Sequence, residues 1–161
     1  MRYYIDAEFN GNGGQLISIA LVRQDGAEFY EVLPAHELIL PWVKQHVMPI
    51  LDKEPVERAT VTRKLQKFLR KDMGPHSFIA DWPEDIVHFC NLLLRDHGKR
   101  NDPLRFRCVL LDLPGFDTAQ ASSKPHNALA DAHSLRAFVE ANLHDDHGRM
   151  VAEDRAMMEG A

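Results

Sequence analysis

The first 33 residues hold three short apolar segments separated by turn sequences, and this pattern limits the possible folds more than any other feature. "RYYIDAEF" (2–9), "QLISIALV" (15–22) and "AEFYEVL" (27–33) are rich in aromatic and aliphatic residues, which is typical of β-strands. The separators "NGNGG" and "RQDG" contain the Asn-Gly and Asp-Gly pairs that hairpin turns favour. The sequence therefore predicts an antiparallel meander of three strands.

After the meander, predicted helices and strands alternate. A proline-interrupted stretch, 34–55, is expected to be a loop with one short helical turn, and "TRKLQKFLRKD" (62–72) an amphipathic helix with Thr62 as its N-cap. Then follow a strand at 76–82, a helix at 83–98, a strand at 106–113 and a helix at 127–143. We expect an α/β fold in which one mixed sheet, the meander plus parallel strands, is flanked by helices.

The length and composition of the chain suit one domain. With 161 residues, 45% of them hydrophobic, the chain can bury a single core. We expect one domain over 1–143 and a C-terminal tail over 144–161 that is helical or partly disordered. No apolar stretch approaches the roughly 20 residues of a membrane helix, and the first residues lack the apolar centre of a signal peptide. The sequence therefore predicts a cytoplasmic protein with no membrane partner.

Charge and cysteine content narrow the function classes. The net charge of −5 argues against a protein that grips long nucleic acids by electrostatics alone, although an enzyme that holds only a strand end remains compatible with it. Cys90 and Cys108 are the two cysteines, and each has apolar neighbours. We expect both to be buried, reduced thiols rather than a disulfide or a metal pair.

Two carboxylates in the first strand are the first candidates for chemistry. Asp6 and Glu8 are two positions apart, so in a strand they project from the same face. Paired acids on a central strand repel each other unless cations or solvent compensate them. A solvated strand face explains such a pair as well, but the central position of this strand favours a site for a hard cation.

Three further residues could complete that site. Asp85 lies in the first turn of the helix at 83–98, where the helix dipole alone would favour an acid, and Asp131 lies among small residues in the last helix. Small neighbours would let that helix approach the sheet and bring Asp131 to the first two acids. His126 lies where a loop enters the same helix, so it could accept a proton there, or be an ordinary capping histidine.

Together these motifs resemble a known family. "DAE" (6–8), "ADWPEDI" (80–86) and "HNALAD" (126–131) are similar, in order and placement, to the three motifs of the DEDDh 3′-to-5′ exonucleases. Within that family the chain looks most like the small bacterial exoribonucleases of the RNase AS type and, more distantly, RNase T. The resemblance implies an RNase H-like fold and release of nucleoside 5′-monophosphates from RNA 3′ ends, with adenylate-rich ends and a homodimer as further expectations.

The same resemblance assigns roles to residues. Asp6 would bridge two Mg²⁺ or Mn²⁺ ions, Glu8 and Asp131 would complete the shell of the first ion, and Asp85 would serve the second. His126 would be the general base. The expected contacts with substrate are made by four residues: Ala7, Phe9, Leu16 and Trp82. Of these, Phe9 and Trp82 could stack on a base, although core positions would suit them too.

The second motif departs from the family pattern. Glu84 stands directly before Asp85, where the family usually has an aromatic residue, and Asp81 takes the place of a frequent Asn. Asp81 is therefore a rival metal ligand to Asp85. The alternatives in function are a 3′-to-5′ exonuclease acting on single-stranded DNA and a nucleic-acid-binding module that has kept the fold without catalysis.

Other patterns carry less weight. "GNGG" (11–14) has no following GK[ST] and precedes a strand, which argues against a phosphate-binding loop. The basic face of the helix at 62–71 is most simply a solvated surface, although it could track an RNA backbone or bind a partner. "HDDH" (144–147) follows a helix end, and its residues are too close in sequence to converge easily on one metal ion.

Overall fold

A computed structural model describes residues 1–36, 38–71, 74–94 and 105–142. Its centre is a five-stranded sheet in the order β3-β2-β1-β4-β5. The strands are β1 (Arg2–Phe9), β2 (Leu16–Arg23), β3 (Glu28–Val32), β4 (His76–Ala80) and β5 (Phe106–Leu110). β1, β2 and β3 pair antiparallel, whereas β4 pairs parallel with both β1 and β5. The predicted mixed sheet is confirmed and is consistent with the RNase H-like fold that the resemblance implies.

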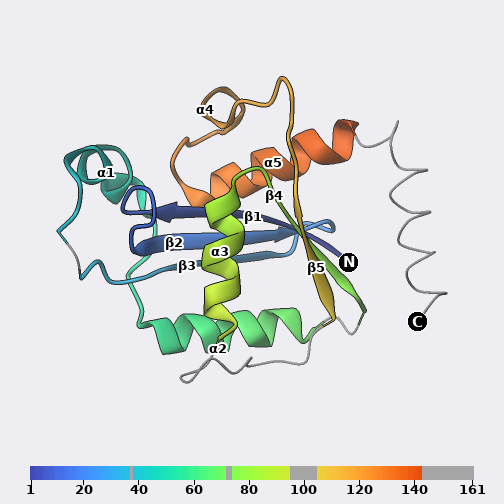
Figure 1. The fold of residues 1–161 in the computed structure, drawn as a ribbon, viewed down its shortest axis with the longest axis horizontal. Helices are drawn as coiled ribbons and strands as arrows, with labels where there is room; N and C mark the ends of the chain where they lie inside the picture. The colour runs from blue at the N-terminus through green and yellow to red at the C-terminus, as the bar shows by residue number, and fades with distance from the viewer. Residues whose placement is uncertain (37, 72–73, 95–104, 143–161) are drawn as a thin grey trace.

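Helices cover both faces of this sheet (Figure 1). They are α1 (Pro41–His46), the 3₁₀ helix η1 (Met48–Ile50), α2 (Arg58–Leu69), α3 (Pro83–Leu92), α4 (Thr118–Ala121) and α5 (Ala128–Asn142). α2 and α3 lie against one face, and α5 lies against the other. Within the described ranges, none of these helices is long and apolar enough to cross a membrane.

The two faces of the sheet differ because side chains alternate along β1. Tyr3, Ile5 and Ala7 point toward α2 and α3 and belong to the largest buried cluster. That cluster is dominated by large side chains: Phe29, Leu65, Phe68, Leu69, Phe78, Phe89 and Leu92. Asp6 and Glu8 therefore face α5.

Small residues bring α5 close to the sheet. Ala128 and Ala132 of α5 are fully buried against Ala20 and Val22 of β2. Ala20 is the strand partner of Asp6, so the closely packed part of α5 lies beside the acids of β1. Farther along, Leu135 continues the contact with a second apolar cluster. The predicted close approach of helix and sheet is confirmed.

Some local predictions were wrong. α2 begins at Arg58 with Glu57 as its N-cap, so Thr62 lies inside the helix and does not cap it. The helix starts one turn earlier, and this turn buries Val61 fully in the large cluster. The Thr62 hydroxyl instead donates a hydrogen bond to the Leu92 carbonyl of α3 (3.4 Å). The segment 34–55, expected to hold one helical turn, forms both α1 and η1.

The expectation for the cysteines is largely confirmed. Cys90 and Cys108 are free thiols that pack against the large cluster, although each is partly rather than fully buried. Burial, followed by the neighbouring Cys90, raises the pKa of the Cys108 thiol to about 12. The predicted tail and the "HDDH" sequence lie outside the described residues. The helix expected over 83–98 was predicted too long, because α3 ends at Leu92, the chain turns at Leu93 and Leu94 already lies in a β-bridge.

Candidate active site

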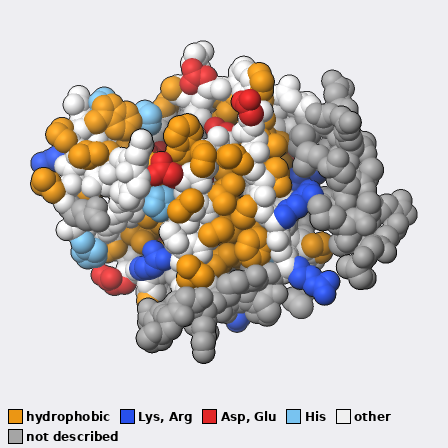
Figure 2. Space-filling model, viewed as in Figure 1, with side chains coloured by type: hydrophobic (Ala, Val, Ile, Leu, Met, Phe, Trp, Pro, Cys, Tyr) orange, Lys and Arg blue, Asp and Glu red, His pale blue; other side chains and the backbone are white. Residues whose placement is uncertain are grey.

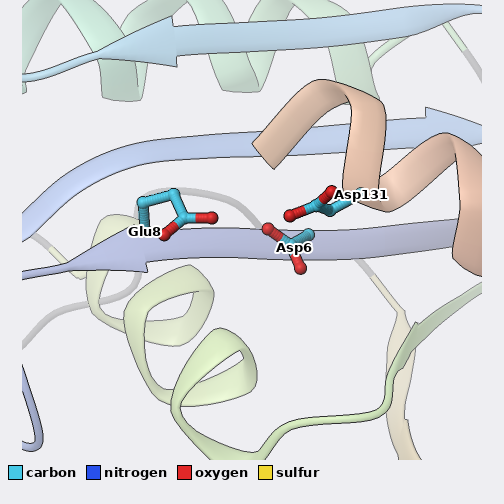
Figure 3. Close-up of side chains that lie close together, drawn as sticks. All are labelled: Asp6, Glu8 and Asp131. Atoms are coloured by element: carbon cyan, nitrogen blue, oxygen red, sulfur yellow. The ribbon is translucent and has the colours of Figure 1, made fainter. Parts of the chain in front are cut away.

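Three carboxylates from two distant segments meet between β1 and α5. Asp6, Glu8 and Asp131 each offer an oxygen, and these oxygens all lie within 4.8 Å of one another. Figure 3 shows the three side chains pointing toward a common space, two from β1 and one from the first turns of α5. The structure therefore brings Asp131 to two acids that lie more than 120 positions before it in the sequence.

Asp85 reaches the same region from α3. β1 pairs with β4 only from Arg2 to Tyr4, so the two strands have separated where β1 reaches Ala7. The Ala7 N–H donates a hydrogen bond to Asp85 Oδ1 (3.1 Å) instead of to a neighbouring strand. Asp85 is only 2% exposed. After burial, its negative charge is the largest cause of the raised pKa of Asp6. The first turn of α3 thus supplies the fourth acid.

The electrostatics of this group suit a cation. Asp6 Oδ2, Asp85 Oδ2 and Asp131 Oδ1 are buried without a hydrogen-bond partner. Burial, followed by the neighbouring acids, raises the pKa values of Asp6 and Asp85 well above their ordinary range. For the same reasons the pKa of Glu8 rises to about 8, and burial raises that of Asp131 to about 6. Unpaired, mutually repelling carboxylates are the oxygen ligands that Mg²⁺ and Mn²⁺ prefer.

His126 lies at the entrance to α5, as the sequence predicts, and has an unusual backbone. Its φ is 69°, which makes it the one non-glycine residue with positive φ among the described residues. Its backbone N–H donates a hydrogen bond to Asp131 Oδ2 (2.9 Å). Strained backbone of this kind is typical of functional sites. The imidazole does not belong to the close group of three carboxylates, but the backbone of His126 is tied to one of its members.

Burial, and then the neighbouring His46, lowers the pKa of His126. A lower pKa means that more of the imidazole is neutral near pH 7, which is the form that accepts a proton. This suits the predicted role of a general base.

Asp81, the rival ligand, lines a cavity of about 440 Å³ at the ends of β4 and β5. Burial raises its pKa, and its charge also raises the pKa values of Asp85 and Asp6. It is not among the three acids whose oxygens lie within 4.8 Å. Asp81 is therefore near the group but outside its three closest members.

The predicted substrate residues fall into two classes. Ala7 and Leu16 are buried in the large apolar cluster, so their side chains leave little surface for a ligand. Phe9 is partly buried and its ring lies 5.1 Å from that of His88. Trp82, which precedes α3, is 54% exposed and lines the cavity next to Asp81. Trp82 is the predicted residue best placed to offer an aromatic face.

Glu84 connects two segments that the sequence analysis treated separately. Its Oε1 accepts a hydrogen bond from the Gly13 N–H of the β1-β2 turn (2.6 Å), and its Oε2 accepts one from the indole Nε1 of Trp82 (3.3 Å). Gly13 has a φ of 70°, a conformation that glycine adopts without strain. The departure from the family pattern therefore has a structural consequence: Glu84 joins the turn to Trp82.

The sequence analysis missed two aromatic residues beside His126. The Trp42 ring lies 4.9 Å from the His126 ring, edge to face, and 4.8 Å from the His46 ring, stacked on it. Both residues belong to α1, inside the segment expected to be mostly loop. The signal in the sequence was Pro41 followed by a tryptophan, a typical helix start that three nearby prolines obscured.

Comparison with known proteins adds independent information. No protein-family model matches the chain. Two curated proteins are similar to it, the 3′-5′ exoribonucleases MT2234.1 and Rv2179c of Mycobacterium tuberculosis strains CDC 1551 / Oshkosh and ATCC 25618 / H37Rv. Each is 38% identical over an alignment of 167 positions, which covers 94% of this chain and 99% of the relative. The similarity thus extends over nearly the full length of both proteins.

Proposed function

The chain belongs to the 3′-5′ exoribonuclease family, and we propose that it is a metal-dependent DEDDh enzyme that removes nucleotides from RNA 3′ ends. The observation that carries the proposal is the convergence of buried carboxylates with unpartnered oxygens between β1, α3 and α5. Such an arrangement costs folding free energy unless cations compensate the charge. Binding of divalent cations would offset this loss of folding free energy and would explain why the acids lie together.

The proposed site has four metal ligands: Asp6, Glu8, Asp85 and Asp131. The charges of the other three all raise the pKa of Asp6. When bound there, two Mg²⁺ or Mn²⁺ ions would neutralise charge that develops on the scissile phosphate and acidify the attacking water. The chain itself supplies the oxygen ligands and fixes their positions.

His126 is the proposed general base. It would accept the proton of the attacking water as the new P–O bond forms and the P–O3′ bond to the penultimate nucleotide breaks. The 3′-oxygen of that nucleotide takes up a proton from solvent and becomes the new 3′ end, and the terminal nucleotide leaves as a nucleoside 5′-monophosphate. The hydrogen bond from its backbone to Asp131 couples the position of the base to that of a metal ligand. Trp82 and Phe9 would contact the terminal nucleotides, and Ala7 and Leu16 would do so through their backbone.

The finer features of the proposal come from the resemblance. They are a preference for adenylate-rich ends, a cytoplasmic location and a homodimer. Exposed apolar surface supports the last of these, because hydrophobic side chains gather over α3 in the face shown in Figure 2, where Val87 is exposed. Light scattering at increasing concentration tests the dimer directly.

A degradation assay tests the function. Oligonucleotides labelled at the 5′ end, as poly(A) RNA, mixed RNA and single-stranded DNA, are incubated with the protein and Mg²⁺ or Mn²⁺. We expect stepwise shortening of RNA, faster for poly(A), that stops with EDTA or with Asp6→Ala. Faster loss of DNA would favour the exodeoxyribonuclease alternative. Binding of all three without any shortening would favour the non-catalytic module and reject the proposal.

A further inference from the structure

We propose that Trp42 is a positioning residue that holds the His126 imidazole in the orientation needed for proton transfer. The inference rests on the proposed role of His126 as general base and adds a residue to it. The edge of one ring meets the face of the other at a centroid distance of 4.9 Å and an interplanar angle of 83°. Edge-to-face pairs of this kind are attractive beyond the area that they bury.

His126 needs such support because its attachment to α5 fixes the backbone and not the ring. The hydrogen bond to Asp131 comes from the backbone N–H, and the positive φ sets where the side chain leaves the chain. Rotation about the two side-chain bonds then decides where the imidazole nitrogens point. Contact with a large flat ring restricts that rotation.

Trp42 is itself held by a second ring and by the helix on which it lies. The His46 ring stacks on it at 4.8 Å, one turn farther along α1. Val43 of α1, and Val47 directly after it, pack against the fully buried Ile17 of β2. The indole therefore sits on a helix that is anchored in a small apolar cluster of its own.

Two asparagines connect the segment that carries Trp42 to the two halves of the site. Asn10, at the end of β1, accepts a hydrogen bond from the Leu40 N–H (2.9 Å) and donates one to the Leu38 carbonyl (3.0 Å). Asn127, which directly follows His126, donates to the Ile50 carbonyl (2.9 Å). One end of the segment is thus tied to the strand with the metal ligands, and the other to the loop with the base.

A salt bridge makes a further connection at the same end. Lys124 lies two residues before His126 in the sequence, and its Nζ is 2.6 Å from Asp52 Oδ2. Because hydrogen bonds and a salt bridge hold both ends of 38–52 to the site, α1 has a fixed position beside His126. Trp42 is the residue of α1 whose side chain contacts the imidazole.

A role in stacking on a nucleotide base is the competing function for Trp42, since the indole is 53% exposed. The two roles differ in kinetics. A positioning residue acts on kcat through His126, whereas a stacking residue acts mainly on KM and does so whether or not His126 is present.

Steady-state kinetics on 5′-labelled RNA separate these roles. We expect Trp42→Ala and Trp42→Leu to lower kcat about tenfold with KM nearly unchanged, because general-base catalysis is worth about 10²- to 10⁴-fold and part of it is lost. Trp42→Phe should restore most of kcat. In the His126→Ala background the same Trp42 substitutions should change kcat less than about twofold, since the base on which Trp42 acts is gone.

Leu38→Ala is the matched control, since this side chain is 94% exposed on the same segment and should leave both constants unchanged. If Trp42→Ala does not fold, as judged by its melting curve, the contrast between Trp42→Leu and Trp42→Phe decides the question. Equal losses of kcat in the presence and absence of His126, or an increase confined to KM, would overturn the positioning role. Full activity of His126→Ala would instead reject the proposed general base itself.

Discussion

The two faces of the sheet are built on opposite principles. Toward α2 and α3, β1 presents Tyr3 and Ile5 to a cluster of large aromatic and aliphatic side chains. Toward α5, the same strand presents Asp6 and Glu8, and the helix meets it with alanines. Burial of large apolar surface stabilises the fold, whereas buried acids oppose it. The apolar packing of the first face thus offsets the unfavourable free energy of holding like charges together on the second.

The largest expected effect comes from neutralising the centre of the acidic face. Asp6→Asn should lower turnover at least about a thousandfold, since stabilisation by metal ions is worth several kcal/mol. The same variant should melt higher than the wild type without cations, because a buried, repelled charge is gone. Activity assays and thermal melts in EDTA measure the two effects.

Asp25→Asn is the control for the gain in stability. Asp25 is an exposed acid paired with Arg23, and this partner holds its pKa at about 2. Its neutralisation should lower the melting temperature slightly or leave it unchanged. An equal gain in both variants would show that net charge, and not repulsion within the site, limits stability.

A truncation in the apolar face should have the reverse profile. Leu65→Ala removes a fully buried side chain of α2 and should lower the free energy of unfolding by about 2–5 kcal/mol. The folded fraction should keep its turnover number. Urea denaturation and active-site titration measure these quantities, with the exposed Leu38→Ala as reference. A large loss of turnover per folded molecule would mean that the two faces are not separable.

Enlarging a small residue of α5 tests the close contact between this helix and the acidic face of the sheet. Ala132→Leu should cost about 1–3 kcal/mol by overpacking against Ala20 and should displace Asp131 from β1. Mn²⁺ affinity, measured by calorimetry, and activity should both fall. Ala137→Leu, on the exposed side of the same helix, is the matched control and should change neither. Unchanged Mn²⁺ affinity in Ala132→Leu would contradict the need for close approach.

The smallest effect on activity is expected from Glu84, which lies beside the carboxylates and bonds to Gly13 and Trp82. Glu84→Ala removes the two hydrogen bonds that join Gly13 and Trp82, and should raise KM about fivefold, the equivalent of roughly 1 kcal/mol, with little change in kcat. Glu54→Ala, an exposed acid elsewhere, controls for charge. A change confined to kcat would assign Glu84 to the chemistry rather than to substrate contacts.

The sequence predicted the sheet and the acids because both leave local marks. Hairpin residues define the meander, and the two-residue spacing of Asp6 and Glu8 places them on one face whatever the rest of the fold does. The start of α5 and the position of Asp131 follow from small residues beside an acid. Local pattern was enough in each case.

Tertiary contacts explain what the sequence could not predict. The ring pair of Trp42 and His126 joins residues 84 positions apart, and nothing in "LPWVKQH" (40–46) indicates its partner. The hydrogen bonds of Glu84 depend in the same way on how the β1-β2 turn approaches α3. Thr62 was assigned as a cap because its residue type favours that position, but the preceding residues extended the helix.

If the acidic face is a cation site, the stability of the protein must depend on pH and on Mg²⁺ together. Burial, followed by the charge of Asp85, raises the folded-state pKa of Asp6 well above that of an unfolded chain, and the pKa values of Glu8 and Asp131 are raised to about 8 and about 6. The folded state therefore binds these protons more tightly, so their contribution to stability is present at about pH 4 and is lost as the pH rises toward 8.

The measurement is the melting temperature of the wild type and of Asp6→Asn between pH 5 and pH 8, in EDTA and in Mg²⁺. In EDTA we predict that the wild type falls further below Asp6→Asn as the pH rises, because only the wild type also has the buried Asp6 carboxyl to deprotonate, and that Mg²⁺ closes or reverses this difference. Melting temperatures of the two proteins that stay parallel across pH and do not respond to Mg²⁺ would contradict a cation site at these carboxylates.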